Sequence, residues 1–183
     1  MTVSIIQKNR DGPKDYMRLY REDYNYRALI NQSIAPIIGR YSGCVLDAGC
    51  GGGFIANLLQ KVGFETMGID KDVGTIVKAR DDFPAVSFLA ENIEDFVKCG
   101  WYRKFDFIIC MNVIHEIKDP QTIVDLMQLS KVFMVVVSET KYFPIKKLKE
   151  LFKDFRIEKL NLDLNNGAFN GLIIYAKKKG KKT

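Results

Sequence analysis

The sequence is poor in the residues from which zinc sites and disulfide frameworks are built. Its 183 residues include one histidine and four cysteines, and no two cysteines have the Cys-x-x-Cys spacing. A Cys/His zinc site needs a cluster of such ligands, and a domain of this size does not depend on disulfides for its stability. We therefore expect reduced thiols and no metal site.

Long hydrophobic runs are missing as well. The longest strongly apolar stretch, Val132–Val137, has six residues, whereas a membrane-spanning helix needs about 20. The first residues, MTVSIIQKNRDG, lack the apolar centre of a signal peptide. These absences predict a cytoplasmic protein without contact to a membrane.

What is present is the composition of one globular domain, with 47% apolar and 27% charged residues. The net charge is +6, but five lysines lie in residues 177–183, and without them it is +1. The basic character is thus concentrated in an expected flexible tail. Such a tail can attract nucleic acid, or it can simply increase solubility.

Short β-rich runs alternate with segments of helical periodicity, which is the pattern of a doubly wound α/β domain. The sequence predicts five parallel strands, followed by a hairpin that turns at Asn165-Asn166-Gly167. The expected fold is a mostly parallel seven-stranded sheet with a C-terminal antiparallel β-hairpin, in three αβα layers. We expect a helical cap over residues 1–40, the main domain over 41–176 and the tail over 177–183.

The most informative stretch is VLDAGCGGGF, Val45–Phe54, because it joins an expected strand to an expected helix through a glycine-rich turn. The dinucleotide pattern G-x-G-x-x-G would need glycine where Phe54 stands. The spacing is instead Asp47-x-Gly49-x-Gly51-x-Gly53. The next strand ends in an acidic residue, Asp70.

This pattern resembles motif I of the class I methyltransferases that depend on S-adenosylmethionine (SAM), and the resemblance extends over about residues 29–176. It implies that SAM is the cofactor and that Gly49, Gly51 and Gly53 form its turn. It also implies that Asp70 accepts hydrogen bonds from the ribose hydroxyls, and that Asp47 lies near the methionine part.

Two further segments correspond to the family's contact regions. Asn92 stands where the family commonly has an aspartate that accepts from the adenine amino group, and Ile93 would pack on the adenine ring. Asn112 and His115 follow the fourth strand, in the segment that lines the methyl-transfer cavity. His115 is either a general base or a residue that packs against the pocket without proton transfer.

The N-terminal residues mix tyrosine and arginine, and we take Tyr20 and Arg27 as candidate contacts to SAM or substrate. The alternative is an ordinary amphipathic helix packed on the domain. Because no Asp/Asn-Pro-Pro-Tyr/Phe motif follows the fourth strand, methylation of base amino groups is not favoured.

The sequence therefore predicts a SAM-dependent methyltransferase acting on an unidentified acceptor, with a small molecule favoured. The alternatives are an RNA or protein methyltransferase, with the basic tail as the contact to nucleic acid, or a non-catalytic SAM-binding partner subunit. A nicotinamide or flavin oxidoreductase is disfavoured because Phe54 breaks its fingerprint.

Overall fold

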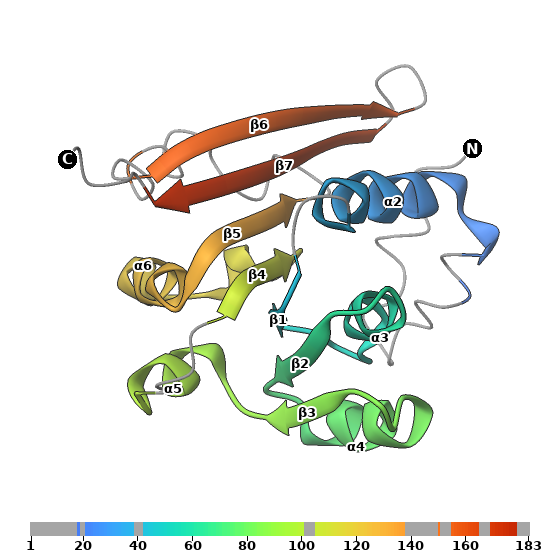
Figure 1. Ribbon diagram of the computed structural model, residues 1–183, viewed down its shortest axis with the longest axis vertical. Helices are drawn as coiled ribbons and strands as arrows, with labels where there is room; N and C mark the ends of the chain where they lie inside the picture. Colours follow the sequence, from blue (N-terminus) through green and yellow to red (C-terminus); the bar gives the residue numbers. More distant parts are fainter. Residues whose placement is uncertain are drawn as a thin grey trace.

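The computed structural model describes residues 18, 21–38, 42–100, 105–137, 150, 155–164 and 169–178 (Figure 1). In chain order the elements are α2 (Tyr24–Ile38), β1 (Cys44–Ala48), α3 (Phe54–Lys61), β2 (Glu65–Asp70), α4 (Val73–Asp82), β3 (Ser87–Ala90), α5 (Ile93–Lys98), β4 (Phe105–Met111), the 3-10 helix η1 (Ile114–Glu116), α6 (Pro120–Gln128), β5 (Ser130–Val137), β6 (Phe155–Leu164) and β7 (Phe169–Lys178). The alternation from β1 to β5 confirms the α/β class.

The strands form a sheet in the order β3-β2-β1-β4-β5-β7-β6. Strands β1 to β5 are parallel to one another, which confirms the parallel sheet, whereas β7 pairs antiparallel with both β5 and β6. The strand order reverses between β1 and β4. In open α/β sheets, ligands bind outside the carboxyl ends of the strands at such a reversal.

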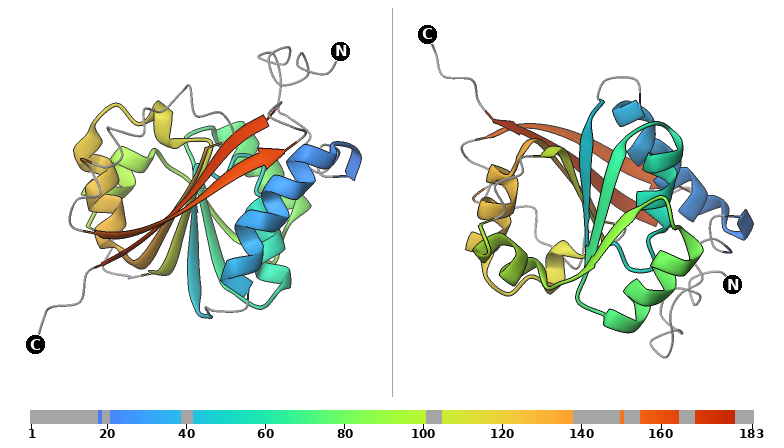
Figure 2. Two further views of the ribbon diagram at one scale, coloured as in Figure 1. Left: turned by 90° about the horizontal axis from the view of Figure 1, so that it is seen from above. Right: turned by 60° about the horizontal axis from the view of Figure 1, so that its bottom comes forward.

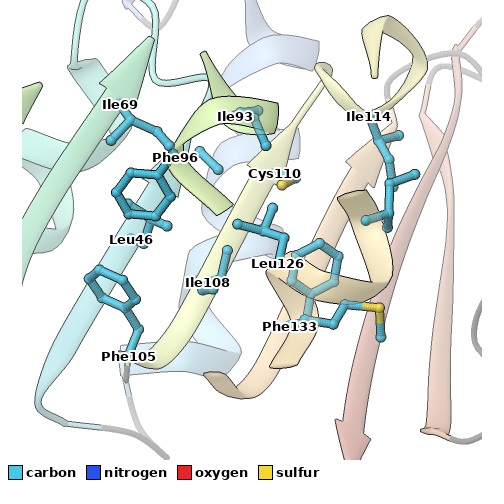
Figure 3. Packing of buried hydrophobic residues seen from close by; sticks show 13 residues of the cluster. Leu46, Ile69, Ile93, Phe96, Phe105, Ile108, Cys110, Ile114, Leu126 and Phe133 are labelled. Carbon is cyan, nitrogen blue, oxygen red and sulfur yellow. The ribbon is translucent and has the colours of Figure 1, made fainter. Parts of the chain in front are cut away.

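Helices cover both faces of the sheet, with α2, α3 and α4 on one side and α5 and α6 on the other (Figure 2). In β1, Val45 packs with α2 and α3, while the next residue, Leu46, packs with α5 and α6. Successive strand residues point to opposite faces, so a strand covered on both sides has a continuous apolar run. Figure 3 shows the cluster beneath α5 and α6, where Phe96 and Leu126 lie close to the sheet.

Helix α2 contributes to the main core. Ile30 and Ile34 are buried in one cluster with Phe107 and Ile109 of β4. The segment expected as a cap over residues 1–40 therefore shares the core of the domain through this helix. In the part of the chain that the structure describes, no helix is both long enough and apolar enough to cross a membrane.

Some elements differ in length from the expectation because backbone hydrogen bonds set their ends. The sequence predicts a helix only to about Arg80 after the second strand, but α4 continues to Asp82, since the N–H of Phe83 still donates to Ala79 O at 2.9 Å. Strand β7 continues to Lys178, so the first two lysines of the expected tail lie in a strand, and Lys177 pairs with Val132. The turn at 165–167 lies outside the described residues.

Candidate functional site

The glycine-rich turn connects the carboxyl end of β1 to the start of α3, next to the reversal in strand order. Its three alternate glycines all have left-handed backbone angles, with φ of 76° at Gly49, 50° at Gly51 and 77° at Gly53. Side chains other than glycine rarely adopt such angles, which explains why glycine recurs at every second position. The amide groups of Gly49 and Cys50 both donate to Ile69 O at 2.9 Å, which ties the turn to β2.

Gly53 also permits close packing between the turn and its neighbours. A Cβ atom at this position would collide with the ring of Phe88 and would lie 3.3 Å from Ala79 Cβ. Phe88 is itself buried in a cluster with Ala79 and Ala56. At Gly52, in contrast, a Cβ atom would meet nothing within 4 Å. The adjacent glycines therefore have very different tolerance to substitution.

We expect Gly53→Ala to lower the free energy of unfolding by about 2–4 kcal/mol, because it combines overpacking with a left-handed backbone angle. The matched control Gly52→Ala should change it by less than about 0.5 kcal/mol. Urea unfolding of both variants measures the difference. Equal stability of the two would show that the turn does not press against Phe88.

Asp70 ends β2 and holds the turn through its carboxylate. Its Oδ2 accepts from the N–H of Gly51 at 2.9 Å, and its Oδ1 accepts from the N–H of Asp72 at 3.0 Å. Each carboxylate oxygen has a second lone pair available, so both remain able to accept from two hydroxyl groups of a ligand. The sequence expectation placed the ribose here but missed the bond to Gly51.

Asp47, near the end of β1, is 2% exposed. Burial raises its pKa from 3.8 to about 7, and the nearby charge of Asp70 raises it further, against the opposing effect of a hydrogen bond from the backbone N–H of Ala56. Among the described residues nothing is hydrogen-bonded to its Oδ2. A buried carboxylate with an unpartnered oxygen is costly when charged, so this position is suited to a cationic or donor group from a ligand.

Two buried thiols, those of Cys50 and Cys110, lie near the carboxylate of Asp47. Burial raises the pKa of Cys50 in the turn and of Cys110 in β4, and the charge of Asp47 adds to both rises. Both therefore remain neutral near pH 7 and add no second negative charge beside Asp47. All four cysteines of the chain are free thiols.

Asn92 and Ile93 lie beyond β3, beside Asp70. Asn92 is the N-cap of α5, and its Oδ1 accepts from the N–H of Glu94 at 2.9 Å. The oxygen that was expected to accept from adenine is thus already used to begin a helix, and an adenine contact by Asn92 stays a prediction. Ile93 is buried in the core cluster beneath α5.

The segment after β4 also lies against the glycine-rich turn. Asn112 has a left-handed backbone, with φ of 55°, and the following Val113 lies where a Cβ atom on Gly49 would be. Asparagine tolerates this conformation better than most residues, and such strained residues are frequent at functional sites. Asn112 and Gly49 were predicted from the sequence, whereas the contact of Val113 with the turn at Gly49 was not.

Other predicted site residues are less closely defined. His115 is in η1, at the carboxyl end of β4, and its side chain is not among those described. Tyr20 lies outside the described residues. Arg27 donates from Nη1 to Arg21 O at 2.9 Å, a contact within the N-terminal segment.

One ion pair near the site had no signal in the sequence. Lys71, which follows Asp70, lies 3.0 Å from Glu116 of η1. The hydrogen bond to Glu116 raises the pKa of Lys71, and the charges of Asp70 and Glu94 act in the same direction. The pair joins the segments that follow β2 and β4. Within the described residues, no group of histidine, cysteine and acidic side chains is arranged to hold a metal ion.

These residues fit SAM, the cofactor implied by the resemblance. The unpartnered oxygen of Asp47 suits the ammonium group of the methionine part, and Asp70 has acceptor capacity for a ribose. The glycine turn exposes backbone where a side chain would block a ligand. A pyrophosphate, which is anionic, would be repelled by a charged Asp47 beside the turn.

Comparison with known proteins agrees with this assignment. The family model described as a methyltransferase domain matches residues 42–179. The ubiquinone biosynthesis O-methyltransferase of Actinobacillus pleuropneumoniae serotype 7 (strain AP76) is 32% identical in an alignment of 93 positions that covers 47% of this chain and 40% of that protein. The chain thus matches less than half the length of this curated relative.

Solved methyltransferases share the fold. The N-methyltransferase NodS of Bradyrhizobium japonicum WM9, in complex with S-adenosyl-L-homocysteine (SAH), has a TM-score of 0.75 at 13% identity, over 91% of this chain and 94% of that one. Magnesium protoporphyrin IX methyltransferase (ChlM) of Synechocystis PCC 6803, with bound SAM, has a TM-score of 0.67 at 17% identity, over 92% of this chain and 86% of that one. At these identities the likeness is one of fold.

Proposed function

Because the chain belongs to the class I SAM-dependent methyltransferases, whose methyl donor is SAM, we propose that it methylates a hydroxyl group of a small molecule. The observation that carries the SAM assignment is the buried Asp47, with its unpartnered oxygen beside the glycine turn. The name of the curated relative, an O-methyltransferase of ubiquinone biosynthesis, supports oxygen as the acceptor atom.

In this proposal SAM, when bound, supplies an electrophilic methyl group on a sulfonium. Asp70 holds the ribose hydroxyls, and Asp47 holds the amino end through Oδ2. Gly49, Gly51 and Gly53 shape the turn so that backbone lies against the cofactor. Asn92 fixes the start of α5 and so positions Ile93, which we propose packs on the adenine.

The acceptor would lie near Asn112 and His115, which follow β4. We propose that His115 would accept the proton of the acceptor hydroxyl, while bound SAM would supply the methyl group. Methyl transfer also gains from proximity and alignment alone, so loss of the base should slow the reaction without abolishing it.

The finer organisation is part of the same proposal. We propose a complete sheet of seven strands with a C-terminal hairpin, supported by the pairings of β5, β7 and β6. We also propose that the catalytic domain comprises α2 together with residues 41–178, and that Tyr20 and Arg27 contact SAM or the acceptor. The lysines from 179 onward remain the candidate contact for a polyanion.

Incubation with methyl-labelled SAM tests the acceptor class. The panel contains hydroxylated aromatic small molecules, total RNA and a protein extract. We expect label in the small molecules, as an ether that resists mild base. Label in RNA or protein alone would overturn the small-molecule assignment, and SAH binding without any transfer would favour a non-catalytic subunit.

A further inference from the structure

An open cavity of about 560 Å³ lies between α3 and α4. Its walls come from both helices, from the segment that follows α4, and from Arg21 before α2. None of its lining residues belongs to the glycine turn, and neither Asp47 nor Asp70 contributes to it. In Figure 1 the two helices lie next to each other on the same side of the sheet. Its volume is within the range of about 300–1,000 Å³ that is typical of small-molecule sites.

Positive charge dominates the lining. Arg21, Lys61 of α3 and Lys78 of α4 face one carboxylate, Asp82. Within the part of the chain that the structure describes, none of these three cations is in an ion pair. Three unpaired cations around one cavity favour an anionic ligand, and a phosphate group accepts from several of them at once.

A buried polar side chain gives the cavity a second recognition group. Asn57 is 8% exposed, and its side-chain amide makes no hydrogen bond to any other described residue. Its backbone N–H donates to Gly53 O at 2.9 Å, in the first turn of α3. Its amide atoms reach the open cavity, where they can donate to an oxygen atom of a ligand.

We propose that this cavity binds a small phosphorylated compound that carries hydroxyl groups, of the size of a sugar phosphate. The phosphate would lie among Arg21, Lys61 and Lys78. Asp82 accepts hydrogen bonds from hydroxyl groups but repels a bare anion, so the ligand needs a neutral hydroxylated body as well as a phosphate. Phe83 provides an apolar wall for that body.

The test is a titration of the ¹⁵N-labelled full chain with ribose 5-phosphate, followed by NMR. We expect the side-chain amide of Asn57 and the backbone amides of Lys61 and Lys78 to shift and to saturate. Inorganic phosphate should bind at least tenfold more weakly, and ribose without a phosphate should cause no shift. The double variant Lys61→Ala/Lys78→Ala should bind at least tenfold more weakly, while Lys98→Ala, on α5, should bind like the wild type.

Three results would overturn the proposal. They are an absence of shifts up to ~10 mM ribose 5-phosphate, equal affinity in the double variant, and shifts confined to residues 49–53. The last would place the compound in the cofactor site instead. The single variant Lys78→Glu, at an exposed position, provides a second test that does not depend on the fold of the double variant. It should also bind ribose 5-phosphate more weakly than the wild type, and equal affinity would overturn the proposal. Because SAM does not enter the experiment, its outcome is independent of the proposed methyltransferase activity.

Discussion

Asp47→Asn is expected to remove a large part of the pH dependence of stability while it weakens SAM binding. Burial raises the pKa of Asp47 from 3.8 to about 7 in the folded protein. Between these two values the folded state keeps a proton that the unfolded state has released, so stability falls as pH rises from about 4 to 7 and then levels off. Because asparagine cannot ionise, the stability of the variant should not fall in this way over the same pH range.

The quantity to measure is the free energy of unfolding in urea, for the wild type and the variant at several pH values. The variant-minus-wild-type difference should increase by an amount on the order of 3 kcal/mol between pH 4 and pH 8. Asp81→Asn, at an exposed site on α4, is the control for the substitution of an aspartate by asparagine. A flat difference for Asp47→Asn would show that its carboxylate is not held neutral by burial.

Asp70→Ala should have the second large effect, on both cofactor binding and stability. Loss of a charged pair of acceptors for the ribose should weaken SAM binding by about 1.5–3 kcal/mol. The variant also leaves the N–H groups of Gly51 and Asp72 without their acceptor, which should cost about 1–2 kcal/mol of stability.

Asp70→Asn separates the two effects. Its amide oxygen still accepts from Gly51, whereas its NH₂ group faces the N–H of Asp72 and cannot accept from it. We expect both SAM affinity and melting temperature in the order wild type, Asn, Ala. Wild-type affinity in the alanine variant would contradict a ribose contact at Asp70.

The turn was predictable because its signal is local. Glycines at every second position indicate left-handed backbone, and the flanking apolar runs place that backbone between a strand and a helix. An acidic residue at the end of the next strand then lies beside the turn, because parallel strands end at the same edge. The α/β class and the order of elements followed from the same periodicity.

What the sequence could not supply depends on contacts between distant segments. Nothing in the sequence distinguishes Phe88 from other strand residues. Only the packing of β3 against the turn shows that the Phe88 ring leaves no room for a side chain at Gly53. The raised pKa of Asp47 arises from burial, which no local pattern reports. Asn92 shows a different difficulty, since an asparagine before a helix is suited both to capping and to ligand binding.

The central claim is that the carboxylates at the ends of β1 and β2, with the glycine turn between them, bind SAM. Calorimetric titration with SAH tests it most directly, for the wild type and for the Asp47→Asn and Asp70→Ala variants, with NAD as the control ligand. The account predicts binding of one SAH per chain, tighter at pH 8 than at pH 6 for the wild type. It also predicts at least tenfold weaker binding by each variant, and none of NAD. Absence of SAH binding at ~1 mM, or equal affinity in the wild type and both variants, would contradict it.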